Sequence, residues 1–442
     1  MVILIKAAQL ILSLSILVII HEFGHFIFSK AFKCRVEKFY LFFDPWFALF
    51  KFQKGETEYG IGWLPLGGYV KISGMIDESM DKEQMKLPPE PWEFRSKPSW
   101  QRLIIMIGGV LFNLILAIVL YSAVLFVWGE QYLPTKNVKY GIAVGETGRE
   151  MGLRSGDKII SIDGKEVEDF GKIPIVMLLD GIKTIEVQRN EEIIVLPVKP
   201  EIIPKLINDR YVISLRIPFS CKVLGFGKDS PARDAGFEIG DEILSINGSA
   251  FQFYDQFTDT VANSKGKTVS VLLKRGGIEK TIPVKIGVAG LLGIHPYRNI
   301  EGVFEYRTIS YGFLESIPAG ISKGYHAVGS YLKQFKLLFA PETKAYESLG
   351  GFIAIGNIFP GVWDWESFWN LTAFLSIILA VMNILPIPAL DGGHVLFLLF
   401  EIITGRKPSD KFLEYAQIVG MVILFSLLLY ANGNDIWKWY KG

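Results

Sequence analysis

Three ionisable residues near the amino terminus have the spacing of a catalytic metal site. His21, Glu22 and His25 form the pattern H-E-x-x-H. Residues four apart lie on one face of a helix, so both imidazoles can bind one Zn²⁺. Glu22 is then close enough to take a proton from a water that the metal activates. Because the pattern also occurs by chance in ordinary helices, its surroundings decide how it is interpreted.

The surroundings of this motif are apolar. Residues 2–20 are apolar or small except for Lys6 and Gln9, and the apolar pattern continues through 26–28. A bilayer core takes about 20 residues of helix, and ionisable groups inside it are costly and usually functional. The motif is therefore expected within a transmembrane helix or at its inner end. A cleaved signal peptide is not expected, because no basic cluster precedes the apolar run and no small-residue cleavage site follows it.

A third metal ligand must come from elsewhere in the chain. Catalytic zinc usually has three protein ligands and a water, and no His or Glu closely follows His25. Asp391 is the candidate, because prolines and glycines break an apolar helix around it. An intramembrane carboxylate needs a partner, and Zn²⁺ is one. Asp391 could instead cap the following helix. His394 is a rival ligand, for which we favour a packing role or a contact with the ligands.

Four apolar segments are long enough to cross a membrane. Basic residues beside their ends mark the inner side, which places both His21 and Asp391 near that side. The segment 311–339 is apolar but contains a proline and three lysines. It is expected to be an amphipathic helix at the interface, because a fifth span would put Asp391 on the wrong side. The expected segments with helices are 1–33, 99–129, 291–365 (with the interfacial helix), 366–404 and 405–442.

The segment 34–98 is rich in aromatic residues and glycine but has no long apolar run. A turn at 64–68 is followed by Tyr69, Val70 and their neighbours up to Ile72, which can form a returning strand. We expect a membrane-associated β-ribbon whose edge can pair with an extended substrate chain. Tyr69 and Val70 are therefore candidate substrate-binding residues.

The region after the second apolar helix contains an internal repeat. Residues 152–164 realign with 236–248 at an offset of 84, and seven of the thirteen positions are identical. Each copy ends in a hairpin signal, Asp-Gly or Asn-Gly, after an Ile-x-Ser-Ile strand. We expect two small β-rich domains, at 130–205 and 206–290. The fold class is thus a multi-pass α-helical membrane protein with four transmembrane helices, a β-ribbon and two β-rich domains.

Composition narrows the function further. Half of the 442 residues are hydrophobic, which favours a membrane protein with soluble parts, and the net charge of +1 gives no support for nucleic-acid binding. Cys34 and Cys221 are the only cysteines. The expected topology puts them on opposite sides of the membrane, which excludes both a disulfide and a cysteine-based zinc site.

Together these motifs resemble the site-2 protease family over essentially the whole chain. The resemblance rests on H-E-F-G-H in the first apolar helix, N-x-x-P-x-P-x-L-D-G-G from Asn383, G-G-Y-V-K between the first two helices, and the repeat S-P-A-x-x-A-G-x-x-x-G-D-x-I-x-x-I-N-G. The first repeat departs from that pattern, because it has Glu-Thr-Gly at 146–148 where the second has Ser-Pro-Ala at 230–232. Its peptide groove is therefore expected to differ.

The resemblance implies an intramembrane zinc metalloprotease of a bacterial inner membrane that cuts transmembrane segments, often after a first protease has removed the substrate's outer domain. It implies that His21, His25 and Asp391 bind Zn²⁺, that Glu22 is the general base, and that Asn383 helps to hold the substrate. It also implies that the repeats are PDZ-like domains on the periplasmic side, which guard access and bind peptide tails. The active site would lie near the cytoplasmic side.

Two other readings of the sequence compete with a protease. A membrane-anchored zinc scaffold with PDZ-like domains would not need Glu22, because a structural zinc site fills all four positions with ligands. A zinc transporter would be expected to have several intramembrane carboxylates or histidines along a path, and the sequence has one such cluster.

Overall fold

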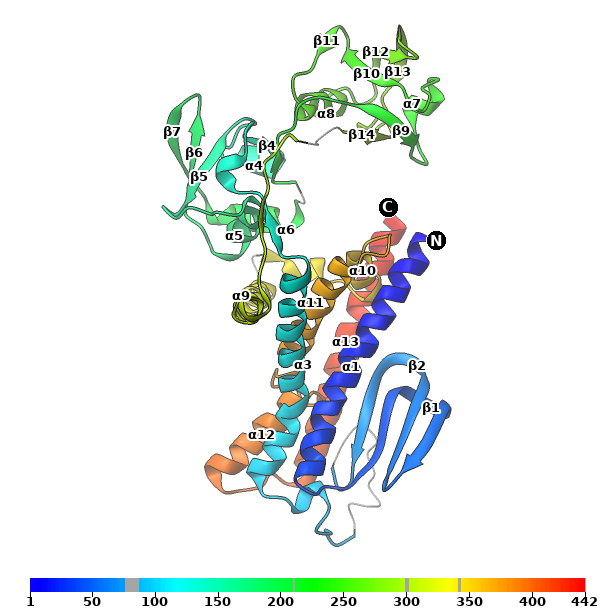
Figure 1. The fold of residues 1–442 in the computed structure, drawn as a ribbon, viewed down its shortest axis with the longest axis vertical. Helices are drawn as coiled ribbons and strands as arrows, with labels where there is room; N and C mark the ends of the chain where they lie inside the picture. Colours follow the sequence, from blue (N-terminus) through cyan, green and yellow to red (C-terminus); the bar gives the residue numbers. More distant parts are fainter. Residues whose placement is uncertain (76–86, 210, 299–301, 341–342, 442) are drawn as a thin grey trace. The chain divides into compact units, whose positions relative to one another are not determined.

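The computed structural model describes residues 1–75, 87–209, 211–298, 302–340 and 343–441. The chain forms two compact units (Figure 1). The first contains Met1–Glu130, Ile309–Ala340 and Lys344–Gly442, and the second contains Gln131–Thr308 with Pro341–Thr343.

Within the described residues, four helices of the first unit are long and apolar enough to cross a membrane. They are α1 (Val2–Ala31), α3 (Ser99–Val127), α11 (Trp365–Asn383) and α13 (Asp410–Lys441). The expectation of four apolar helices is therefore confirmed. The shorter helices α10 (Phe352–Ile358) and α12 (Asp391–Thr404) belong to the same unit.

Helix α3 contacts α1, α9, α11 and α12, and Figure 1 shows it running beside α1. Glycine makes the contact with α1 close: a Cβ atom added at Gly24 would lie 2.3 Å from the carbonyl oxygen of Gly108. On another side, the hydroxyl of Ser376 in α11 donates to the main-chain oxygen of Asn113 at 2.7 Å. Small residues and buried hydrogen bonds are what hold helices together in lipid, where the hydrophobic effect gives no driving force.

The chain turns sharply between α11 and α12. Ala389 has a φ of 90°, a region that residues with a side chain rarely adopt. Gly393 is required by the turn, since a Cβ atom there would lie 2.6 Å from the Cα of Pro388. Strained backbone of this kind often occurs at functional sites, and here it places Asp391 at the first position of α12.

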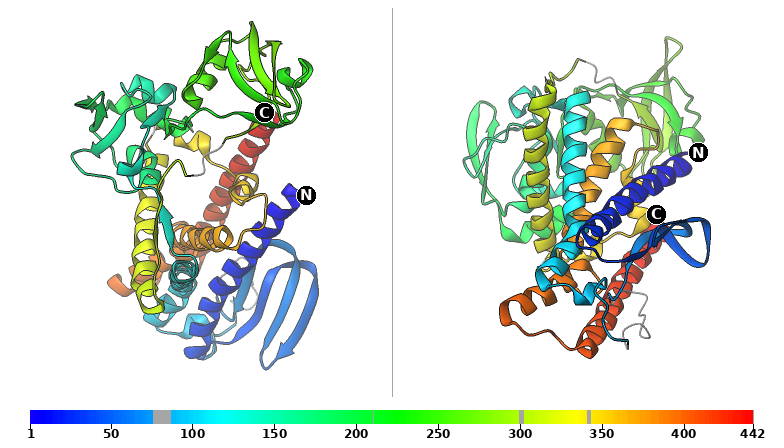
Figure 2. Two further views of the ribbon diagram at one scale, coloured as in Figure 1. Left: turned by 45° about the horizontal axis from the view of Figure 1, so that its top comes forward. Right: turned by 60° about the horizontal axis from the view of Figure 1, so that its bottom comes forward.

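Residues 36–72 form two paired strands, β1 (Val36–Lys54) and β2 (Thr57–Ile72), which lie beside α1 in Figures 1 and 2. Strand β1 pairs with β2 twice, because Tyr40 is opposite both Gly60 and Tyr69. The register gives a folded sheet of four segments in the order 68–72, 36–41, 57–62 and 48–54. Segment 68–72 is an edge, and no other strand of the described residues pairs with it.

Helix α9 (Phe313–Leu338) lies across α3, since Figure 1 looks along α9 while α3 runs up the picture. The two helices touch closely: a Cβ atom at Gly320 would lie 2.1 Å from the hydroxyl of Ser122. Among the described residues, α9 is not one of the helices apolar enough to span a membrane.

The second unit contains two repeats, each with its own apolar core. The first has a three-stranded sheet β5-β6-β7 and a separate pair β4-β8. Its elements are β4 (Ile142–Val144), α4 (Glu146–Glu150), β5 (Lys158–Ile162), α5 (Ile173–Leu179), β6 (Thr184–Arg189), β7 (Glu192–Pro197), α6 (Ile203–Asn208) and β8 (Ile213–Leu215).

The second repeat has the strand order β13-β12-β10-β9-β14, and β11 pairs with β10. Its elements are β9 (Lys222–Phe226), α7 (Pro231–Asp234), β10 (Glu242–Ile246), β11 (Ser249–Ala250), α8 (Tyr254–Ala262), β12 (Thr268–Arg275), β13 (Ile278–Lys285) and β14 (Ile294–Tyr297). Two short strands, β3 (Glu130–Tyr132) and β15 (Arg307–Ile309), lie where the chain passes between the units.

The strand pairing shifts the expected limits of the repeats. Strand β8 lies beyond residue 205 but pairs with β4, and β14 lies beyond residue 290 but pairs with β9. Each repeat is therefore completed by a strand that returns late in the chain to its first strand. Local sequence patterns do not reveal such non-local pairing. The hairpin signals at Asp163 and Asn247 do form turns, with φ of 49° and 51° and a positive φ at the following glycine.

Candidate metal centre

Two histidines from α1 and one aspartate from α12 bring their side-chain atoms to a single point. The Nε2 atoms of His21 and His25 lie 3.1 and 3.2 Å from Oδ2 of Asp391, and 3.3 Å from each other. Ligand atoms about 2.0–2.1 Å from a tetrahedral Zn²⁺ are spaced about 3.3–3.4 Å apart. The three atoms therefore have nearly the spacing that one zinc ion requires.

The hydrogen bonding of Asp391 also fits a cation. Its Oδ2 atom is buried and makes no hydrogen bond of acceptable geometry, although two imidazole nitrogens lie within 3.2 Å. His21 and His25 are 8% and 7% exposed. A buried carboxylate oxygen that faces two nitrogens without a hydrogen bond is costly unless a positive ion lies between them.

Helix α3 forms the wall behind the two imidazoles. A Cβ atom at Gly109 would lie 2.5 Å from Nε2 of His25 and 2.6 Å from Cε1 of His21. Glycine at this position therefore lets both rings lie directly against the helix. In the sequence, the pair Gly108-Gly109 is compatible with close helix contact, but it does not show that the contact is with the candidate ligands.

Polar groups of α3 and α11 orient the rings. Nδ1 of His25 lies 2.9 Å from the carbonyl oxygen of Ile105, and Nδ1 of His21 lies 3.1 Å from the amide nitrogen of Asn113. The amide nitrogen of Asn383 lies 3.2 Å from Nε2 of His21. The side-chain amide of Asn113, on the second apolar helix, therefore contacts a candidate ligand.

A cavity of about 910 Å³ opens at this site. All seven residues that the sequence singled out for the metal, the general base and the substrate line this one cavity: His21, Glu22, His25, Tyr69, Val70, Asn383 and Asp391. Every residue of the edge segment 68–72 of the ribbon lies in the wall of this cavity. An extended peptide lying along that edge would therefore pass beside the metal ligands and Glu22.

Polar pairs stabilise the ribbon beside the cavity. The hydroxyl of Tyr69 donates to Asp44 at 2.8 Å, and the hydroxyl of Tyr40 donates to Glu58 at 2.7 Å. Burial, together with the hydrogen bond to Asp44, raises the pKa of Tyr69 well above its usual range. Tyr69 therefore remains a protonated donor, which ties the edge strand to the loop around Asp44.

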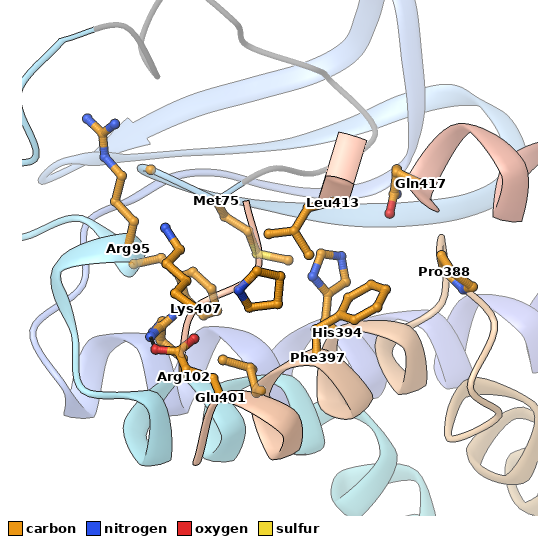
Figure 3. A pocket seen from close by; sticks show the side chains of 14 residues that line it. Met75, Arg95, Arg102, Pro388, His394, Phe397, Glu401, Lys407, Leu413 and Gln417 are labelled. Carbon is orange, nitrogen blue, oxygen red and sulfur yellow. Dashed lines mark hydrogen bonds and ion pairs between the residues drawn. The ribbon is translucent and has the colours of Figure 1, made fainter. Parts of the chain in front are cut away.

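His394 is not part of the metal group found among the described residues. Its side chain lines the large cavity and also a second cavity of about 60 Å³, where Figure 3 shows it near Phe397 and Leu413. The wall of the second cavity also contains the ion pair between Arg102 and Glu401. This pair ties α3 to α12, the helix that begins with Asp391.

Comparison with known proteins gave matches over nearly the whole chain. The family model described as Peptidase family M50 matches residues 9–427. A Vibrio cholerae protein named "Putative zinc metalloprotease" is 27% identical over 96% of this chain and 97% of its own length. The "Regulator of sigma E protease" of Haemophilus influenzae is 28% identical over 96% of this chain and 97% of its own length. Among solved structures, the PDZ domain of the SdrC-like protein of Listeria monocytogenes is 29% identical, with a TM-score of 0.16, and covers 18% of this chain and 90% of that domain.

Proposed function

The chain belongs to peptidase family M50, the site-2 protease family, and we propose that it hydrolyses peptide bonds within or near transmembrane segments of other membrane proteins. The substrates would be membrane proteins such as anti-sigma factors after a first cut, or remnant signal peptides. One observation supports this proposal most strongly. A single cavity, bounded by candidate transmembrane helices, contains three possible ligand atoms at metal spacing, a glutamate, and a strand edge beside which no further strand of the described residues lies.

Zinc is the metal proposed for His21, His25 and Asp391. Two imidazoles and a carboxylate are a frequent donor set for catalytic zinc, which keeps its fourth position open, and relatives of this chain carry zinc metalloprotease in their names. When bound, zinc supplies Lewis acidity, which polarises water and stabilises the negative charge that develops on the scissile carbonyl oxygen.

Glu22 is proposed as the general base. Its carboxylate accepts the proton that the attacking water loses, and then delivers this proton to the nitrogen of the leaving amine. Glu22 follows His21 directly and lines the same cavity, so it can reach a water held at the metal. A structural metal site would have no use for a carboxylate at this position.

Edge segment 68–72 is proposed to hold the substrate. A transmembrane helix hides its carbonyl groups in its own hydrogen bonds, so it must unwind before a bond can be attacked. Main-chain pairing with Tyr69 and Val70 would stabilise the unwound segment by adding a strand to the sheet. The amide of Asn383, which also lines the cavity, would donate to a substrate carbonyl.

The proposed location is a bacterial inner membrane, with the metal site near the cytoplasmic side. Lys30 and Lys33 at the end of α1, and Arg95 and Lys97 before α3, are the expected inside markers. Helix α9 and the ribbon would rest against membrane lipid, since α9 presents Leu314, Ile321 and other exposed apolar residues.

The two repeats of the second unit are proposed to be PDZ-like domains on the periplasmic side. Their role would be to restrict access to the cavity and to bind peptide tails by adding a strand. The first repeat has no Ser-Pro-Ala sequence at 146–148. The two repeats would therefore have different peptide preferences.

The experiment is to measure zinc content and cleavage of a model transmembrane substrate with the purified full-length protein. Wild type, Glu22→Gln and, as a matched control, Glu366→Gln at an exposed position in the first turn of α11 would be compared. We expect equal zinc in all three and cleavage by all except Glu22→Gln. Cleavage by Glu22→Gln would overturn its assignment as the base. Equal zinc without cleavage by any protein, across several substrates, would favour a non-catalytic scaffold.

A further inference from the structure

Asn113 is a fully buried polar residue on α3, 0% exposed, inside a candidate transmembrane helix. Its amide nitrogen lies 3.1 Å from Nδ1 of His21. Its side-chain oxygen, Oδ1, has no hydrogen-bond partner. A buried amide oxygen without a partner is destabilising, so the position needs an explanation beyond helix packing.

The explanation lies in the tautomer that His21 must adopt. Its Nε2 atom is the one that faces His25 and Asp391. A neutral imidazole that binds a metal through Nε2 carries its hydrogen on Nδ1. A hydrogen on Nδ1 needs an acceptor, and an amide N–H group cannot be one. Rotation of the Asn113 amide by half a turn would place the unpartnered Oδ1 at this position.

The Nδ1 atom of His25 can be compared with that of His21. Its Nδ1 lies 2.9 Å from the carbonyl oxygen of Ile105, which can only accept a hydrogen bond. His25 is therefore already held as the tautomer with hydrogen on Nδ1 and a lone pair on Nε2. His21 lies on the same helix face and has Asn113, not a carbonyl group, at the corresponding atom.

We propose that Asn113 is a positioning residue whose side-chain oxygen accepts a hydrogen bond from Nδ1–H of His21 when the metal is bound. The inference rests on the metal site proposed above and assigns a role that H-E-x-x-H does not contain. Asn113 is itself held in place, because its main-chain oxygen accepts a hydrogen bond from Ser376. Contacts of α3 with α1 and α11 thus fix the ring of His21.

The test is the rate at which the purified full-length protein releases zinc to a strong colorimetric chelator. Asn113→Leu keeps the approximate shape and removes the acceptor, and Asn113→Asp keeps an acceptor and removes every donor. Losing a partner of this kind typically weakens metal binding about 10- to 100-fold. We expect release about 10-fold or more faster for Asn113→Leu, and release no faster than wild type for Asn113→Asp.

A matched control separates this role from general packing. Thr372 is also 0% exposed and its hydroxyl bonds across helices to Ser13 at 3.0 Å, but its hydrogen-bond partners, Ser13 and the main-chain oxygen of Phe368, are not candidate metal ligands. Thr372→Val should release zinc at the wild-type rate. If Thr372→Val and Asn113→Leu accelerate release equally, Asn113 acts through packing and the proposal is wrong.

Asn113→Asp decides the question even if Asn113→Leu does not fold. A group that donates to His21 would be lost in Asn113→Asp, whereas an acceptor would be kept, so 10-fold faster release from Asn113→Asp would overturn the proposal. If wild type binds zinc and Asn113→Leu releases it at the same rate, only this inference fails. If wild type binds no zinc, the metal site itself is wrong and the inference falls with it.

Discussion

The two units of the chain differ in how completely their buried side-chain polar atoms are hydrogen-bonded. Among the described residues, buried side-chain atoms without a hydrogen bond occur only in the first unit: Gln9 Oε1, Ser29 Oγ, Asn113 Oδ1 and Asp391 Oδ2. Two of these four, on Asn113 and Asp391, belong to the candidate metal centre or contact it. In the second unit, the buried carboxylates Asp157 and Asp241, each 1% exposed, have all their partners.

In each repeat, an arginine and a main-chain N–H group donate hydrogen bonds to the buried aspartate. In the first, Arg189 donates to both oxygens of Asp157 at 2.8 Å and to the carbonyl oxygen of Gly152. The main-chain N–H of Arg154 donates to the same carboxylate at 2.8 Å. The aspartate belongs to the Gly-Asp pair of the sequence repeat, so part of the repeat encodes this network.

The second repeat has the same bonds at the equivalent positions. Arg275 donates to both oxygens of Asp241 at 2.7 Å and to the carbonyl oxygen of Gly236 at 2.9 Å. The main-chain N–H of Glu238 donates to Asp241 at 2.9 Å. The difference between the units supports the roles proposed for them: a satisfied buried carboxylate stabilises a fold, whereas an unsatisfied one at metal spacing has the surroundings that a metal ligand needs.

The largest effect should come from Asp391→Asn. We expect cleavage to fall by at least about 10³-fold, because Lewis-acid catalysis contributes several kcal/mol, and zinc to be lost from the purified protein. The helices should remain folded, since Asp391 Oδ2 has no hydrogen bond to lose. Metal analysis, a cleavage assay and thermal unfolding measure the three quantities.

Removal of zinc by a chelator is the matching control for Asp391→Asn. It should abolish cleavage by wild type and leave the thermal transition of the second unit unchanged, because no metal group is found in that unit among the described residues. Asp391→Asn with normal zinc content would contradict its assignment as a ligand.

Arg275→Met should have the opposite effect to Asp391→Asn: it should lower stability and leave zinc content unchanged. Removing one partner of a buried ion pair costs about 3–5 kcal/mol, and we expect about 2–3 kcal/mol here because Arg275 is 21% exposed. The second repeat should unfold at lower temperature and become sensitive to limited proteolysis, while zinc content stays normal. Arg189→Met should destabilise the first repeat in the same way. Loss of zinc in either variant would show that the two kinds of site are not independent.

Much of the candidate metal centre's geometry could be predicted from the sequence because its constraints are local or follow from the expected order of the spans. His21 and His25 share a helix face, and the order of the spans places Asp391 at their level. Gly109 and Asn113 could not be assigned to the site in advance. Their types indicate close or polar helix contact, but which face of α3 meets α1 depends on packing of the whole bundle.

The ribbon was predicted from the sequence only in part. A returning strand at 69–72 was foreseeable from its pattern, but the double pairing of β1 was not. That pairing requires β1 to fold back, and Phe42 and Trp46 have φ of 67° and 74° there. Bulky residues rarely adopt such values, so Phe42 and Trp46 did not mark the bend, although Asp44-Pro45 between them is a pair that favours turns. The partners Arg189 and Arg275 were missed for a related reason, since each lies more than 30 residues from its aspartate.

The smallest effect in this comparison is the pH dependence of the second repeat. Burial of Asp241 opposes its ionisation, but hydrogen bonds from Arg275 and from the main chain of Glu238 outweigh burial and lower its pKa. A carboxyl group with a lower pKa when folded adds stability above its unfolded pKa of about 3.9. That stability is lost as the pH falls through the folded pKa. Unfolding of the second repeat should therefore become easier below about pH 4 in wild type.

Asp241→Asn should lack this pH dependence, because it has no carboxyl group to protonate at that position. The variant should be less stable than wild type at pH 7 and closer to it in acid, with the two curves converging as the carboxyl group of wild type is protonated. If the free energies of unfolding of wild type and Asp241→Asn change in parallel with pH across this range, the pairing of Asp241 with Arg275 adds no net stability. The hydrogen-bonded carboxylate of Asp241 would then not stabilise the second repeat. The difference proposed between the two units would be supported only by the candidate metal centre.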